Sequence, residues 1–346
     1  MPHDSAYQQP GPIATSRSAR VAASRKLLRR NARRSASAFL ADGPQAVREA
    51  LTYHRRDDAA PGHPNGLHVD VAPGHPNGLH VQVAEVYVDA SLTSRHADLL
   101  AIADKAGIRI VSCDSKAIAS LSEAVTPQGI IARCAFLDLP LATLLDSGST
   151  PALTTPDPTS VPASGGPAPT IVDDGRRPVE TSQAENVRQP GRPRLIAVPV
   201  DVRDPGNLGT IIRCADAAGA DGVAILGDSV DLYNAKTVRS TAGSIFHVPV
   251  ALEPDPVAGI TALRAAGLQI VATEGEASTD LDQFIDDGGL AAPTAWLFGN
   301  EAHGLPEDIA ALADVRIRIP IRGLAESLNL STAAAVCLFA SARAHR

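Results

Sequence analysis

The 346-residue chain is poor in aromatic residues and has no long uninterrupted apolar run. Aromatic side chains make up 3% of the sequence, so Ala, Val, Leu and Ile must fill the core that a hydrophobic content of 44% can build. No apolar run reaches the roughly 20 residues that a membrane-spanning helix needs. We therefore expect a soluble, cytoplasmic protein without a membrane partner, and the length allows two domains.

Cysteine is scarce as well, and the four cysteines form no Cys-x-x-Cys pair. Such spacing favours free thiols in a reducing compartment over a disulfide framework or a zinc site. The sequence also lacks a Gly-x-Gly-x-x-Gly turn after a strand, a Gly-Lys-Ser/Thr phosphate loop, a His-Glu-x-x-His helix and a Gly-x-Ser-x-Gly elbow. These absences argue against nucleotide-dependent oxidoreductases, common Rossmann-type methyltransferases, P-loop enzymes and the usual hydrolases.

Positive charge is concentrated near the N-terminus, although the whole chain has a net charge of -7. Residues 17–34 read RSARVAASRKLLRRNARR and contain no acid. Three interpretations fit this amphipathic run: a helix that contacts RNA phosphates, a solvated helix face, or an Arg-rich targeting peptide. The run continues into patterned sequence, which argues against a cleaved peptide. Arg29, Arg30 and Arg33 are the predicted phosphate contacts.

Composition divides the chain into four parts. Residues 1–19 are predicted to be a disordered tail, 20–140 a small α/β domain, 141–192 a flexible linker rich in Pro, Ser, Thr and Gly, and 193–346 a second domain. In the small domain we expect helices at 43–51, 96–107 and 115–124, and strands at 83–90, 108–114 and 129–136. In the second domain strands are expected at 195–202, 222–227, 268–275, 294–300 and 315–321. Their alternation with helices predicts a mostly parallel sheet covered on both faces.

A tandem duplication interrupts the small domain: APGHPNGLHVDV at residues 60–71 is followed by APGHPNGLHVQV at 72–83. Its four histidines could suggest a metal site. A near-perfect copy with Pro-Asn-Gly turns is more typical of a recent duplication that lengthens a surface loop. We therefore predict that the protein binds no metal.

Three polar loops follow predicted strands of the second domain. They contain DPGNLGTIIR at residues 204–213, FGNEAHGLP at 298–306 and IPIRGLAESLNLS at 319–331. Each alone fits an ordinary turn, a helix cap or an exposed acid. Because ligands bind at the carboxyl edge of open α/β sheets, we expect the three loops to meet there and form a site.

In this order and spacing, the three loops resemble the motifs of the SpoU (TrmH-type) branch of the SPOUT RNA methyltransferases. The resemblance covers roughly residues 193–346, and the RKLLRRNARR and LSEAVTPQGIIA segments resemble the ribosomal-protein-like substrate-binding domain that often precedes it. The duplicated loop and the long linker depart from that pattern. The resemblance implies a trefoil-knotted α/β domain, S-adenosyl-L-methionine as methyl donor, a ribose 2′-hydroxyl as acceptor and a homodimer formed through the C-terminal domain. It favours ribosomal RNA over transfer RNA as the substrate.

Matching the motifs position by position implies a catalytic set that consists of Asn207, Arg213, Glu301, Ser327 and Asn329. Arg213 is often cast as the base in this family, but a guanidinium stays protonated, so we expect it to position phosphate and stabilise charge. Glu301 is expected to orient an arginine or the Ser-Asn pair. Arg239 either holds an RNA phosphate or is a solvated helix arginine. A non-catalytic RNA-binding protein of the same fold remains the alternative, and the intact catalytic set argues against it.

The resemblance also implies a set of cofactor contacts that consists of Thr273, Gly299, Asn300, Ile319 and Leu328. Gly299 would let the backbone approach the cofactor, since a side chain there would block close approach. Ile319 and Leu328 would offer main-chain groups to the adenine and methionine parts.

Overall fold

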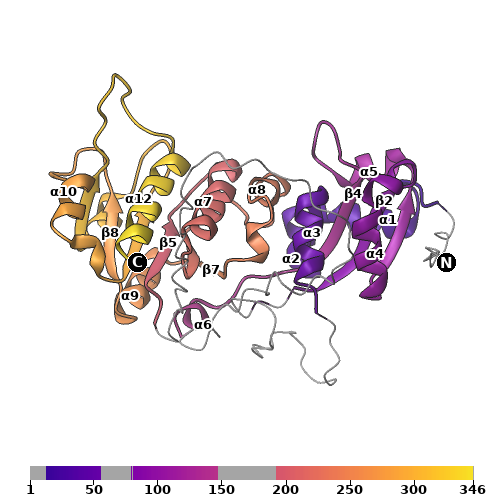
Figure 1. The fold of residues 1–346 in the computed structure, drawn as a ribbon, viewed down its shortest axis with the longest axis horizontal. Helices are drawn as coiled ribbons and strands as arrows, with labels where there is room; N and C mark the ends of the chain where they lie inside the picture. Colours follow the sequence, from indigo (N-terminus) through magenta and orange to yellow (C-terminus); the bar gives the residue numbers. More distant parts are fainter. Residues whose placement is uncertain (1–12, 56–78, 80, 147–191, 346) are drawn as a thin grey trace, which may run out of the picture.

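The computed structural model describes residues 13–55, 79, 81–146 and 192–345. Two sheets lie in separate halves of the chain, the first drawn in indigo and magenta and the second in rose through orange to yellow (Figure 1). Most of the duplicated segment, of the predicted tail and of the predicted linker lies outside the described residues. None of the described helices is both long and apolar enough to span a bilayer.

The N-terminal domain is built on a four-stranded sheet with the order β1-β4-β2-β3. β4 (Ile130–Ala135) pairs antiparallel with β1 (Ala38–Asp42) and β2 (Val83–Asp89), and β3 (Arg109–Cys113) pairs parallel with β2. The helical segments are α1 (Ala19–Arg25), η1 (Lys26–Leu28), α2 (Arg30–Ala36), α3 (Pro44–Thr52), η2 (Ala90–Leu92), η3 (Ser94–His96), α4 (Ala97–Lys105) and α5 (Ser115–Leu121). The predicted helices and strands of this domain are present. β1 was not predicted, because all its residues are buried and it shows no polar alternation.

The C-terminal domain contains a seven-stranded sheet with the order β7-β6-β5-β10-β8-β11-β9, in which every pair is parallel. Its strands are β5 (Leu195–Pro199), β6 (Gly222–Leu226), β7 (Val250–Glu253), β8 (Gln269–Thr273), β9 (Thr279–Asp280), β10 (Thr294–Phe298) and β11 (Val315–Arg318). The helical segments are α7 (Pro205–Ala218), α8 (Ala235–Ser240), η4 (Ser244–Phe246), α9 (Pro256–Ala265), α10 (Leu281–Asp286), η5 (Gly289–Ala291), α11 (Glu307–Ala310) and α12 (Leu330–Ala344). The predicted parallel α/β fold is confirmed.

The central strand β10 shows how both faces of this sheet are covered. Trp296 and Phe298 belong to the cluster that packs under α7 and α12, whereas Ala295 and Leu297 belong to the cluster on the other face. Successive side chains of a strand point to opposite faces, so an all-apolar strand requires two cores. The Trp296 indole donates a hydrogen bond to Ser341 Oγ of α12 at 2.8 Å, which fixes the last helix to the sheet.

Two predicted boundaries differ in the structure. Residues 141–145, predicted as the start of the linker, form helix α6 (Leu141–Leu145). Its three leucines are buried in the cluster on the α9 face, because their spacing places them on one side of a helix. The end of the predicted tail is also bound, since Ala14 N donates a hydrogen bond to Ser112 O of β3.

The two domains share one hydrophobic core. Phe39 and Phe136 of the N-terminal domain pack against Tyr233, with ring centroids 4.7 Å and 4.0 Å from it. The Tyr233 hydroxyl accepts hydrogen bonds from the backbone N–H groups of Leu137 and Asp138. Arg33 of α2 forms a largely buried ion pair with Asp231, at 2.5 Å. The chain therefore folds with its domains fixed against each other rather than as two independent units.

Candidate functional site

The predicted site residues lie on loops that follow four neighbouring strands. β5, β10, β8 and β11 stand side by side in the sheet and run parallel. Their carboxyl ends therefore share one edge, and the three motif loops start from this edge. The expectation that the loops meet is confirmed by the hydrogen bonds between them.

A chain of hydrogen bonds joins all three loops through their side chains. Asn207 Nδ2 donates to Glu301 Oε1 at 3.1 Å, and Asn329 Nδ2 donates to Asn207 Oδ1 at 3.0 Å. Asn329 Oδ1 in turn accepts from Ser331 N at 2.9 Å and from Ser331 Oγ at 2.7 Å. The direction of the chain is fixed at both ends, because a backbone N–H can only donate and a carboxylate can only accept. Three of the predicted catalytic residues thus form one network.

Helix starts place the two asparagines. Asp204 caps α7 by accepting from Asn207 N, and Pro205 occupies the first helical position, where a missing N–H costs nothing. Asn329 itself caps α12. Each asparagine is therefore held at a helix N-terminus by ordinary capping chemistry.

Glu301 is bound by donors from the first loop. Besides Asn207, the backbone N–H groups of Arg203 and Asp204 donate to its two carboxylate oxygens at 3.2 Å and 3.1 Å. Partial burial alone would raise the pKa of Glu301, but the hydrogen bonds outweigh it and the pKa lies below the usual value. Glu301 is therefore an ionised acceptor that orients Asn207. The expectation that it orients an arginine or the Ser-Asn pair stays a prediction; in the structure its side-chain partner is Asn207, which in turn bonds Asn329.

An open cleft of about 970 Å³ lies between the first and second loops. Asp204, Asn207, Glu301, His303 and Pro306 are among its lining residues. The bonds of the network use one N–H of each asparagine amide. Within the described part of the chain, the second N–H of each amide has no recorded partner, so it can donate to an incoming oxygen atom.

Gly299 is required by its own loop. A Cβ at this position would lie 2.3 Å from the backbone of Gly304 and Leu305, which crosses directly over it. Asn300 holds the same loop to the first one, because its Nδ2 donates to Asp201 O at 2.9 Å. The cofactor contact expected at Gly299 stays a prediction, and the structure adds a second reason for the glycine, the close approach of the loop to itself.

The remaining predicted cofactor residues lie at the ends of β8 and β11. Thr273 ends β8 and donates from Oγ1 to Leu297 O at 3.1 Å, while Ile319 directly follows β11 and is partly buried. Leu328 is 36% exposed in the loop before α12. Around these loops Gly275, Gly304 and Gly323 face open space, since a Cβ on any of them would meet no atom within 4 Å. The backbone of three adjacent loops is therefore accessible to a ligand.

Arg213 and Ser327 stand apart from the network. Arg213 follows Asn207 by six residues on α7, so the helical period turns it roughly 120° away. Its side chain is exposed, and no partner for it is recorded among the described residues. Ser327 is exposed in the third loop and likewise has no recorded hydrogen bond there, whereas Ser331 takes the contact with Asn329.

The four predicted RNA contacts fall into two groups. Arg29 and Arg30 are exposed at the start of α2. Arg33 is only 4% exposed and is paired with Asp231, so it joins the domains and cannot reach a phosphate in this arrangement. Arg239 is partly buried at the domain boundary, 3.7 Å from Asp42, where burial raises the pKa of the Asp42 carboxyl more than Ser122 and Arg239 lower it.

Sequence reasoning missed the charged residues around the first loop. Arg203 forms an exposed ion pair with Asp228 at 2.8 Å, and Lys236 forms one with Asp204 at 2.7 Å. Asp-Pro before a helix is a cap signal that could have identified Asp204. No local signal marks Arg203, because its partner lies 25 residues away.

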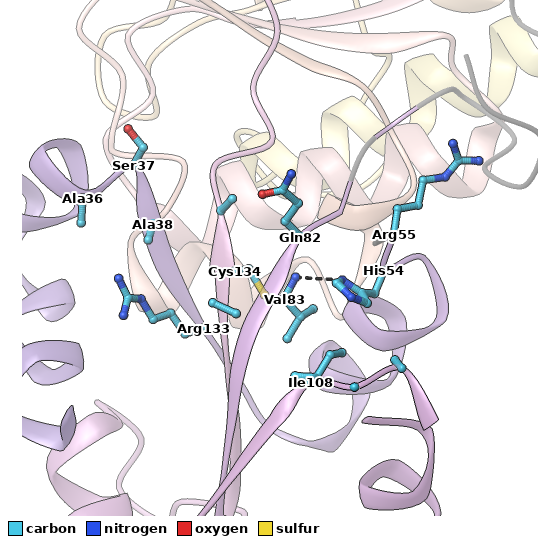
Figure 2. A pocket seen from close by; sticks show the side chains of 14 residues that line it. Ala36, Ser37, Ala38, His54, Arg55, Gln82, Val83, Ile108, Arg133 and Cys134 are labelled. Carbon is cyan, nitrogen blue, oxygen red and sulfur yellow. Dashed lines mark hydrogen bonds between the residues drawn. The ribbon is translucent and has the colours of Figure 1, made fainter. Parts of the chain in front are cut away.

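A second cleft, of about 420 Å³, lies in the N-terminal domain (Figure 2). His54 and Arg55 lie on one side of it and Arg133 on the other, and Val83 N donates to His54 Nδ1 at 3.1 Å. All its lining residues belong to the N-terminal domain. This cleft is therefore separate from the three loops.

Possible metal ligands do not cluster in the described part of the chain. There, no group of three or more His, Cys, Asp or Glu side chains is arranged to hold an ion. The histidines of the duplicated segment, His63, His68, His75 and His80, lie outside the described residues. The expectation of a metal-free protein stays a prediction.

Two protein-family descriptions match the chain. Residues 194–339 match the SpoU rRNA Methylase family, and residues 78–140 match the RNA 2'-O ribose methyltransferase substrate binding family. The first match contains all three motif loops. The second coincides with β2 to β4 of the N-terminal domain and the segment that leads to α6.

Individual relatives agree with these matches. The chain is 41% identical over 142 residues to a 23S rRNA (uridine(2479)-2'-O)-methyltransferase from Streptomyces viridochromogenes, covering 40% of this chain and 49% of the relative. It is 26% identical over 262 residues to the 23S rRNA (guanosine-2'-O-)-methyltransferase RlmB of Nitrosomonas europaea, covering 75% and 84%. The chain thus spans about half the length of the first of these relatives. An AdoMet-bound rRNA methyltransferase structure from Sinorhizobium meliloti matches 97% of this chain and 98% of its own, with TM-score 0.65 and 25% identity.

Proposed function

Because residues 194–339 match the SpoU rRNA Methylase family and residues 78–140 match its substrate-binding family, we propose that the chain transfers a methyl group from S-adenosyl-L-methionine to a ribose 2′-hydroxyl of ribosomal RNA. The single observation that carries this proposal is the hydrogen-bonded chain from Glu301 through Asn207 and Asn329 to Ser331. It joins the three motif loops beside an open cleft. The relatives named above act on 23S rRNA, which makes that RNA the first substrate to test.

The loops after β10, β8 and β11 provide the cofactor site in this proposal. Their exposed backbone, with open space beside Gly275 and Gly323, suits a ligand that is held largely by main-chain groups. Thr273, Asn300, Ile319 and Leu328 would contribute from the strand ends. When bound, S-adenosylmethionine supplies a methyl group on a positively charged sulfur, and a ribose oxygen is the matching nucleophile.

The residues of the network act by positioning. Glu301 is ionised and already accepts three hydrogen bonds, so it is a weak base and a firm anchor for Asn207. Asn207 and Asn329 each keep one N–H that can hold an oxygen of the target nucleotide in line with the methyl group. Correct alignment alone accounts for large rate factors in such transfers. The Arg213 guanidinium stabilises the phosphate of the target nucleotide in this proposal.

Methyl transfer to unmodified transcripts tests the function. Tritiated S-adenosylmethionine is incubated with in vitro transcribed 23S rRNA, 16S rRNA and transfer RNA, and the label is mapped by resistance to alkaline hydrolysis at one ribose. We expect label in 23S rRNA from the wild-type protein and from Arg264→Ala, a control at the opposite edge of the sheet. Label only in transfer RNA would support the alternative of a transfer RNA methyltransferase. Cofactor binding without label in any transcript or in ribosomal assembly particles would support a non-catalytic RNA-binding protein.

A homodimer through α12 is also part of the proposal. Val336 and Phe339 are 39% and 51% exposed on one side of α12, an apolar face that a second copy of the domain would cover. The return of the chain from β11 to pack α12 against α7, β5 and β10 is also compatible with the implied knot. Light scattering on Phe339→Glu is expected to give a monomer, whereas Val257→Glu, which charges a similarly exposed site on α9, should remain dimeric. A monomeric wild-type protein would refute this arrangement.

A further inference from the structure

One loop connects the basic N-terminal helix to the proposed site. Residues 227–234, called here the bridging loop, run between β6 and α8. On one side Asp231 holds Arg33 of α2. On the other side Ser229 Oγ accepts from Val202 N at 3.1 Å, and Asp201 Oδ1 accepts from Asp228 N at 2.8 Å. The bridging loop therefore fixes the position of α2 relative to the first motif loop.

One exposed arginine lies on each side of the bridging loop as a result, Arg203 beside the first motif loop and Arg30 on α2. Arg203 Nη1 binds Asp228 Oδ2 at 2.8 Å, and both side chains are more than half exposed. Arg30 lies one turn before Arg33 on α2, and its positive charge contributes to lowering the pKa of Asp228, after the larger effect of Arg203. The order Arg30, Asp228, Arg203 leads from the N-terminal domain to the cleft, because Arg203 also lines it.

The cleft needs such cations. Asp201, Asp204 and Glu301 line it, and the chain as a whole carries a net charge of -7. Phosphates approaching this edge would be repelled unless positive side chains stand at the rim. Arg203 is exposed at the rim of the cleft, and its present partner Asp228 is exposed too. If Arg203 binds a phosphate instead, the Asp228 carboxylate remains in contact with solvent and no unpaired charge is buried.

We propose that Arg203 and Arg30 bind phosphates of the RNA strand that enters the cleft, and that Asp228 holds Arg203 in place until the RNA arrives. This rests on the proposed function for the identity of the substrate. It adds a defined path from the basic helix to the site. It also assigns a role to an ion pair that is not part of any of the three motifs.

Salt-dependent RNA binding tests the path. Binding of unmodified 23S rRNA transcript is measured by filter retention between 50 and 200 mM salt for wild type, Arg203→Ala, Arg30→Ala and Arg264→Ala. Arg264 is the matched control, because it forms a similar ion pair with Asp314 at the opposite edge of the sheet. Each phosphate contact that a substitution removes should reduce the steepness of the slope of log affinity against log salt concentration by roughly 0.7 to 0.9. We expect that loss, with about 5-fold to 20-fold weaker binding at 100 mM salt, for Arg203→Ala and Arg30→Ala only.

Substitution of Asp228 should raise the RNA affinity, whereas substitution of the arginines should lower it. Asp228→Asn removes the carboxylate that competes with phosphate for Arg203, so it should bind RNA about 2-fold to 5-fold more tightly. Asp98→Asn, which removes the same charge from an exposed pair with Arg48, should leave the affinity unchanged. Weaker binding by Asp228→Asn would mean that the ion pair only supports the fold, and would overturn the proposal.

The two proposals fail in different ways. If the wild-type protein methylates 23S rRNA but Arg203→Ala and Arg30→Ala behave like Arg264→Ala, the RNA path is wrong and the proposed function stands. If the salt slopes change as expected but no RNA is methylated, the path stands and the proposed function is wrong. Melting curves for all variants exclude loss of fold as the cause.

Discussion

Asn329 has two separate tasks, and two substitutions can separate them. Its Oδ1 caps α12 through Ser331, and its Nδ2 holds Asn207. Asn329→Ala removes both. Loss of the cap costs about 1 kcal/mol and loss of an exposed hydrogen bond about another 1 kcal/mol. A loss of about 2 kcal/mol lowers the melting temperature by roughly 4–8 °C in a domain of this size.

Asn329→Asp keeps the cap and loses only the contact with Asn207. A carboxylate accepts from Ser331 as the amide does, and its negative charge is favourable at a helix N-terminus. It cannot donate to Asn207 Oδ1, so the two oxygens repel and Asn207 turns away. Misalignment of the target oxygen by even about 1 Å can cost roughly 100-fold in rate. We therefore expect a protein that melts within about 2 °C of wild type but has lost about 100-fold in kcat/KM.

Thermal melts and single-turnover methyl transfer on 23S rRNA measure the two effects in parallel. Asp114→Ala is the matched control, since it removes the side-chain cap of α5 in the N-terminal domain, away from the three motif loops. It should lose stability as Asn329→Ala does and keep its activity. Activity of Asn329→Asp within threefold of wild type would refute the positioning role of the network.

Two other expectations follow from charged groups. Glu301→Gln turns one accepting oxygen into a donor that faces the donors of the first loop, so kcat/KM should fall about 10-fold or more while Asn207 loses its anchor; an unchanged rate in the same assay would contradict this. Burial lowers the pKa of His247, but its bonds to Asp216 and Glu49 outweigh this and the pKa lies above the usual value. Protonated His247 therefore adds its full contribution to the free energy of unfolding below about pH 6.5, and this contribution is lost as pH rises through the raised pKa. The melting temperatures of wild type and His247→Gln should converge at high pH. If the difference in melting temperature between the two proteins stays constant from pH 6 to 9, His247 does not join the domains electrostatically.

The sequence predicted the elements well because their signals are local. Alternation of apolar strands with helices placed the core of the C-terminal domain. Strand β1 was not predicted because it is buried on both faces and so lacks the apolar–polar alternation that marks a strand. Helix α6 was not predicted because Pro, Ser and Thr dominate the residues that follow it. Its three leucines within five residues are too short a pattern to indicate a helix.

The contacts between distant segments could not be predicted in the same way. Motif positions named Asn207, Glu301 and Asn329, but their bonding order depends on the register of strands that are about 100 residues apart in sequence. The same holds for Arg33. An arginine in a basic run is normally solvated, and only the fold shows that this one is buried against Asp231. The charge pattern of a sequence therefore locates a basic segment, but it does not tell which of its arginines are exposed and which are buried in ion pairs.

If the chain binds RNA as proposed, the carboxylates at its binding face must serve other purposes. Here Glu301 accepts three hydrogen bonds from the first motif loop, Asp204 caps α7 and binds Lys236, and Asp201 accepts from the bridging loop. Each negative charge is thereby partly neutralised by backbone or side-chain donors that the fold supplies. The cations that pair with exposed acids, Arg203 above all, remain at the surface, where phosphate can replace their partners. Neutralisation inside the cleft and exchangeable pairs at its rim together explain how a net charge of -7 is compatible with an RNA substrate.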